Sequence, residues 1–115
     1  MPVFDERNNT FSPKDPDEVI TLSFDFTVFG SGFSNPVCTV SHLEGVADAA
    51  AADMAVVGAI SVTSGILTQR IQDGVNGADY LVTAQVSQGS NIFIISGVLP
   101  VRDAVGRYSQ SEIID

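Results

Sequence analysis

The chain has 115 residues, of which 44% are hydrophobic and only 17% are charged, a composition that predicts one globular domain. Its formal net charge of −9 argues against nucleic acid or anionic lipid as the main partner, because both bind basic surfaces. One cysteine (Cys38), one histidine (His42) and no tryptophan exclude an intrachain disulfide and a zinc site of cysteine and histidine ligands.

Residues 1–17 are predicted to form an extended N-terminal arm. Pro13 and Pro16 each push the preceding residue out of the helical region, and the segment shows little hydrophobic periodicity. It is also polar and acidic, unlike a signal peptide, and no run of about 18 apolar residues predicts a transmembrane helix. The arm carries Phe4 and Phe11. We expect contacts with other chains to order it, because alone it cannot offset roughly 1–2 kcal/mol of backbone entropy per residue.

The clearest strand signal begins at Glu18 and is closed by glycines 30 and 32. Five apolar residues alternate with polar ones, which predicts one buried and one solvated face. The residues predicted to be buried are Ile20, Leu22, Phe24, Phe26 and Val28. Replacing Phe24 with alanine is expected to cost about 3–5 kcal/mol.

A second, weaker strand is predicted over residues 37–42. The alanine-rich segment 45–58 that follows favours helix by propensity, with Asp48 as a possible N-cap, but it is short and lies between strands. We interpret it as a turn or as one to two helical turns.

Strand signals then recur over residues 59–62, 66–72, 80–86 and 92–101, separated by turn clusters. Tyr80, Val82, Ala84 and Val86 fall on one face and are predicted to be buried, and Gly89 suits a hairpin loop. Pro100 places the end of the last strand at an edge or sheet margin. Residues 103–115 form a polar C-terminal tail.

About seven short strands with closely spaced turns predict an all-β fold, an antiparallel sandwich over residues 18–102 with an arm at each end. Tyr80 follows a glycine-rich corner, as in immunoglobulin-like (Ig-like) sandwiches, where this side chain bonds upstream backbone. We therefore predict an Ig-like sandwich without its disulfide, and a hydrogen bond between the Tyr80 hydroxyl and a backbone group within residues 73–77.

Residue chemistry predicts no enzyme and no cofactor or metal. Cys38 and His42 share a strand face but lie roughly 13 Å apart, too far for a nucleophile and its base. Asp73, Asn76 and Asp79 could converge on calcium, but the usual ligand pattern is missing and turn formation explains them.

The cations are few. Arg70 and Arg102 are expected to pair with nearby aspartates or to make an intersubunit contact.

Three segments carry a family resemblance. They are Lys14–Val19 (KDPDEV), residues 68–80 (TQRIQDGVNGADY) and residues 99–102 (LPVR). Together they resemble the small phage fiber-tail adaptor proteins of tailed bacteriophages, over residues 14–102. Relatives often carry tryptophan in the first two strands, where this chain has Phe24, Phe26 and Val40, and the tail after Arg102 is additional and could alter its partners.

The resemblance implies a non-enzymatic virion component at the head–tail (neck) or tail–fibre junction. It implies a ring of copies, contacts with other phage virion proteins, and assembly in the cytoplasm of the bacterial host, where disulfides are rare. The predicted interface residues are Phe4, Phe11, Arg102, Ile113 and Ile114.

Two other functions stay open on the sequence. One is an Ig-like surface module that binds a host receptor or glycan, and the other is a capsid decoration (cement) protein. Recognition modules expose loop aromatics, and only Phe33 and Tyr108 qualify here.

Overall fold

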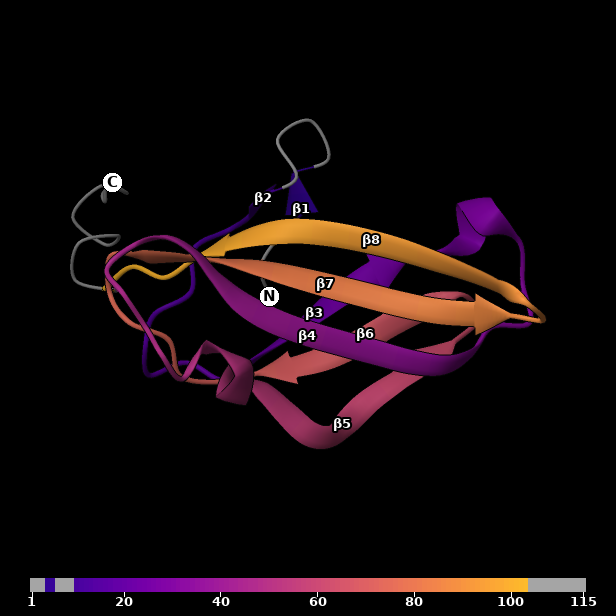
Figure 1. Ribbon diagram of the computed structural model, residues 1–115, viewed down its shortest axis with the longest axis horizontal. Coiled ribbons are helices and arrows are strands. Elements are labelled where there is room, and N and C mark those ends of the chain that lie inside the picture. The colour runs from indigo at the N-terminus through magenta and orange to yellow at the C-terminus, as the bar shows by residue number, and fades with distance from the viewer. Residues whose placement is uncertain (1–3, 6–9, 104–115) are drawn as a thin grey trace, which may run out of the picture.

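Two β-sheets pack face to face over one core in the computed structural model, which describes residues 4–5 and 10–103 (Figure 1). The strands and the two short 3₁₀ helices are β1 (Phe4–Asp5), β2 (Thr10–Phe11), β3 (Ile20–Asp25), η1 (Thr27–Phe29), β4 (Ser34–Gly45), η2 (Ala51–Met54), β5 (Ala55–Thr63), β6 (Ile66–Ile71), β7 (Ala78–Gln88) and β8 (Asn91–Pro100).

The larger sheet has the strand order β1-β2-β8-β7-β4 and the smaller one the order β3-β6-β5. Every pairing is antiparallel except that of β2 with β8. Figure 1 shows the long strands of both sheets running along the long axis of the molecule, with the β7–β8 hairpin at one end. The predicted all-β sandwich is confirmed, and its assignment to the Ig-like class stays a prediction.

The core lies between the facing sides of the two sheets. Alternation in β7 is regular, and all four residues predicted to be buried there are fully buried. From the smaller sheet Leu22, Phe24 and Leu67 face them. The predicted hairpin is present, with a loop of two residues, 89–90, and Gly89 takes the positive φ (+61°) for which glycine is suited.

The first strand ends earlier than its periodicity predicts. Leu22, Phe24 and Phe26 are buried and Ile20 is half-buried, but Val28 is 81% exposed, so its predicted burial is wrong. The reason is local: Asp25 Oδ1 accepts hydrogen bonds from the Thr27 amide (2.9 Å) and the Thr27 hydroxyl (2.6 Å). This turn competes with the extended backbone and starts η1 in place of more strand.

The N-terminal segment from residue 10 onward packs on its own sandwich. Phe11 is 3% exposed and its ring meets that of Phe24 edge-on, with centroids 5.5 Å apart. Lys14 is fully buried and forms a parallel bridge with Val101. The expectation that other chains alone order residues 1–17 is therefore wrong for residues 10–17. The sequence did not reveal this burial, because a strand of two residues is too short to show a period.

The alanine-rich segment forms one short 3₁₀ helix, η2, in agreement with the interpretation of a turn or short helix. Its N-cap is Ala50 and not Asp48; Asp48 Oδ1 instead accepts a hydrogen bond from the Ala50 amide at 2.9 Å, in the turn before η2. Met54 of η2 is fully buried.

Candidate functional site

Tyr80 is the centre of a buried polar corner at the end of the sandwich opposite the β7–β8 hairpin. Its hydroxyl accepts a hydrogen bond from the Val75 amide (2.8 Å) and donates one to Asp48 Oδ2 (2.7 Å). The predicted bond to backbone within residues 73–77 is confirmed, whereas the carboxylate partner was not foreseen. Burial, and then the Asp48 carboxylate, raise the pKa of Tyr80 to about 12.

Lys14 enters the same corner from the N-terminal segment. Its Nζ donates to the carbonyl oxygens of Asp73 (2.5 Å) and Asp15 (2.8 Å). Burial lowers the pKa of Lys14, and the nearby Glu18 and Asp73 carboxylates oppose that shift. Lys14 thus joins the N-terminal segment to the turn before β7, and sequence reasoning missed this because lysine is rarely fully buried.

Arg102 closes the corner from the C-terminal side. Its guanidinium donates to Asp79 Oδ1 (2.9 Å) and to the carbonyl oxygens of Val101 (2.8 Å) and Ala78 (3.1 Å). Of the two expectations for this arginine, pairing with a nearby aspartate is the one found. The side chain is still 41% exposed, so a role in an interface stays a prediction.

The other predicted interface residues have different outcomes. Phe11 belongs to the core of its own chain, so its assignment as an intersubunit contact is wrong. The backbone of Phe4 pairs with that of Phe11, while the Phe4 side chain, Ile113 and Ile114 lie outside the described residues.

Cys38 and His42 both lie on β4, and their side chains contact different neighbours. Cys38 packs against the core, and burial raises the pKa of its thiol to about 12, so the thiol stays protonated at neutral pH. His42 Nε2 lies 2.8 Å from the Val46 carbonyl oxygen, and its ring meets Tyr80 edge-on. Both side chains therefore make local contacts within the fold.

The acidic residues have separate partners as well. The Asp79 carboxylate pairs with Arg102, and Asn76 Oδ1 accepts the Asp103 amide at 2.7 Å. Within residues 4–5 and 10–103, no cluster of three or more histidine, cysteine, aspartate or glutamate side chains could hold a metal ion. The same part of the chain contains no helix long and apolar enough to cross a membrane.

On β4, β7 and β8, the outer face of the larger sheet carries no charged side chain from Leu81 to the β7–β8 hairpin. At the opposite end Asp79 of β7 lies on the same face, with Glu44 of β4 as its register partner. The strand register places on it Val37, Thr39 and Ser41 of β4, Leu81, Thr83, Gln85 and Ser87 of β7, and Ile92, Ile94, Ser96 and Val98 of β8. Three of the apolar residues are strongly exposed: Val37 at 44%, Ile92 at 59% and Ile94 at 55%. In a chain of net charge −9, this face combines exposed aliphatic groups with neutral polar ones.

An aromatic cluster occupies the hairpin end of the molecule. Phe29 stacks on Phe93 with centroids 4.5 Å apart, and Phe33 meets Phe93 edge-on. Phe29 is 39% exposed, whereas Phe33 is half-buried against the core. The exposed loop aromatic among the described residues is therefore Phe29 and not the predicted Phe33.

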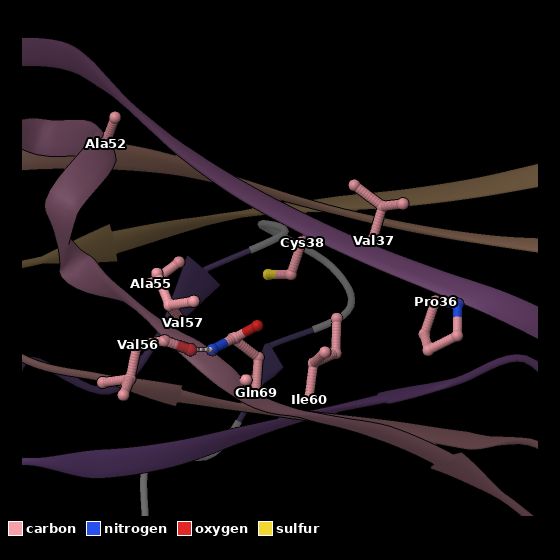
Figure 2. Close-up of a pocket in the computed structure, with 10 residues that line it drawn as sticks. Pro36, Val37, Cys38, Ala52, Ala55, Val56, Val57, Ile60 and Gln69 are labelled. Atoms are coloured by element: carbon pink, nitrogen blue, oxygen red, sulfur yellow. Dashed lines mark hydrogen bonds between the residues drawn. The ribbon is translucent and has the colours of Figure 1, made fainter.

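A groove of about 280 Å³ opens between β4 and β5, the outermost strands of the two sheets on this side (Figure 2). Its walls come from residues 36–38 of β4, from Ala52, and from residues of β5, and Gln69 of β6 reaches into it. None of the described residues that line it is charged. The groove exists because β5 leaves β6 between Ala55 and Ile60, where the strand register shifts. Val57 in this bulge is 97% exposed.

No family model, no curated protein and no solved structure matches the chain.

Proposed function

We propose that the chain is a structural component of a tailed-phage virion, an adaptor at the head–tail or tail–fibre junction that acts through protein–protein contacts. The sequence resemblance over residues 14–102 supports the phage assignment. The uncharged part of the outer face of the larger sheet, from Leu81 to the hairpin end, supports the mode of action and is the observation that carries it.

The segments behind the resemblance meet at the polar corner. Lys14 Nζ bonds the Asp73 carbonyl, and the Arg102 amide donates to the Lys14 carbonyl at 2.8 Å. The Gly77 amide donates in turn to the Val101 carbonyl at 2.9 Å. These residues therefore hold the fold together, so most contacts with partners require a second surface.

The outer sheet face fits that requirement. A partner can cover its uncharged part without removing charges from water, which is costly unless every charge is paired. Copies of one acidic chain repel each other, and a neutral face is where they can approach with least repulsion. Its exposed aliphatic groups supply apolar contact, and its hydroxyls supply hydrogen bonds of the kind common at interfaces.

A reconstruction of the particle that contains this chain tests the assignment directly. We expect density for the sandwich at the neck or the tail–fibre junction, repeated around the particle axis. A position at a receptor-binding tip would instead support the function of a recognition module. A position on the capsid lattice would support that of a decoration protein. Absence from the particle would refute all three.

Two substitutions test the surface. Thr39→Lys and Ile94→Lys put a cation on the outer face without touching the core, and each should reduce incorporation into particles severalfold. Val28→Lys is the matched control, because Val28 is 81% exposed and lies away from this face. Equal incorporation of all three variants would show that the outer face makes no essential contact.

A further inference from the structure

Gln69 is a buried polar side chain on the floor of the groove, only 3% exposed. Its Nε2 donates to the carbonyl oxygens of Arg70 (2.8 Å) and Val56 (3.1 Å). Because both amide hydrogens have carbonyl partners, these bonds also settle which end of the amide is the oxygen.

The other end of this amide has no hydrogen-bond partner in the part of the chain that the structure describes. Figure 2 shows Gln69 Oε1 pointing toward Cys38, away from the bonded nitrogen. Among residues 4–5 and 10–103, no donor forms a hydrogen bond with this oxygen. Buried carbonyl oxygens nearly always accept a hydrogen bond, so the groove contains one unmet acceptor.

We propose that the groove binds the side chain of a tyrosine or tryptophan from a partner polypeptide, whose O–H or N–H donates to Gln69 Oε1. This chemistry is independent of the virion role proposed above.

The lining selects this class of side chain. Its walls are largely apolar, and a lysine or arginine would be buried there without an acidic partner. A cavity of about 150 Å³ accommodates benzene, so about 280 Å³ leaves room for a phenol or an indole. These two rings combine a large apolar body with one hydrogen-bond donor, which matches apolar walls with one acceptor.

The position of the groove favours a polypeptide as the source. It lies between two edge strands, β4 and β5, whose outer backbone groups are available to residues on either side of an inserted side chain. The bulge of β5 widens this opening, and the exposed Val57 beside it offers apolar contact to the same segment.

The test uses the full chain labelled with ¹⁵N, with p-cresol and 3-methylindole as probes and toluene as the probe that lacks a donor. We expect p-cresol and 3-methylindole to shift the Gln69 side-chain amide signal and the backbone amides of Cys38 and Ile60. Because a neutral hydrogen bond adds modestly to affinity, both should bind about three- to tenfold more tightly than toluene. Equal affinity for toluene, or shifts located elsewhere, would overturn the proposal.

Cys38→Leu fills the groove and should abolish the shifts. Thr39→Leu, one residue along the same strand but on the opposite face, is the matched control and should retain them. Dispersed amide signals in both variants show that the sandwich is folded. If Cys38→Leu binds p-cresol like the unmodified chain, the groove is not the site.

A short acetylated peptide with one tyrosine flanked by glycine and serine tests the source. It should bind more tightly than p-cresol, because its backbone can reach the strand edges. No gain over p-cresol would overturn the polypeptide source. The Tyr108→Phe substitution tests the chain's own tail. If it shifts the Gln69 side-chain signal when no probe is present, the tail occupies the groove, and the proposal of a partner polypeptide is overturned.

Discussion

The Tyr80 hydroxyl donates a 2.7 Å hydrogen bond to Asp48, a residue 32 positions earlier in the chain. The same oxygen accepts the Val75 amide, so one side chain connects the segment before η2, the turn before β7, and β7 itself. With Lys14 and Arg102 at the same corner, this end of the sandwich is held by polar contacts, whereas the core between the sheets is apolar except for Gln69.

Tyr80→Phe should lower the free energy of unfolding by about 1–3 kcal/mol, because the Val75 amide and the Asp48 carboxylate each lose a buried partner. Denaturant unfolding measures the change. Asp48→Asn keeps an acceptor for the hydroxyl and should cost less. A Tyr80→Phe chain as stable as the original would show that the corner contributes nothing to stability.

High pH should weaken the fold through Tyr80. Its folded pKa, about 12, lies above the ordinary value of 10.0, so the folded state holds this proton more tightly than the unfolded state does. The contribution is complete below pH 10 and is lost as pH rises toward 12.

Phenolate absorbance in a Tyr108→Phe chain should therefore give a midpoint near 12 for Tyr80. The stability advantage of the original chain over Tyr80→Phe should shrink across the same pH range. A phenol midpoint near 10 would contradict the buried hydrogen-bonded state.

Phe11→Ala should cost about 3–5 kcal/mol, as expected for a buried aromatic residue, because it removes the packing on Phe24. Val28→Ala, an exposed control, should change stability by less than about 0.5 kcal/mol. Thermal or denaturant unfolding of the isolated chain compares the two. A negligible effect of Phe11→Ala would restore the view that this segment needs other chains.

Lys14→Met keeps the buried apolar stem but removes the ammonium group. The carbonyl oxygens of Asp15 and Asp73 then lose their donor, and the free energy of unfolding should fall by about 2–3 kcal/mol. Arg70→Met, at an exposed position, should stay within about 0.5 kcal/mol of the original chain. A neutral or stabilising Lys14→Met would show that burying the charge costs as much as its hydrogen bonds contribute.

The sequence by itself determined the features that depend on neighbouring residues. Alternation with a period of two identified the buried faces of β3 and β7, because successive side chains of a strand point to opposite sides. Glycine identified the hairpin between β7 and β8, and the position of Tyr80 after a turn predicted its bond to that turn. One boundary was not predicted: the hydrogen bond from the Thr27 amide to the Asp25 side chain forms a turn that ends β3 before Val28.

Only the tertiary structure decided the polar contacts between distant segments. Lys14 donates a hydrogen bond to the carbonyl oxygen of a residue 59 positions away, and Asp48 accepts one from Tyr80, 32 positions away. Gln69 lies on a buried strand face where its pattern position calls for an apolar residue. A polar group can be buried only if hydrogen-bond partners lie beside it in the folded chain. When those partners come from distant segments, the local pattern of residues does not reveal them.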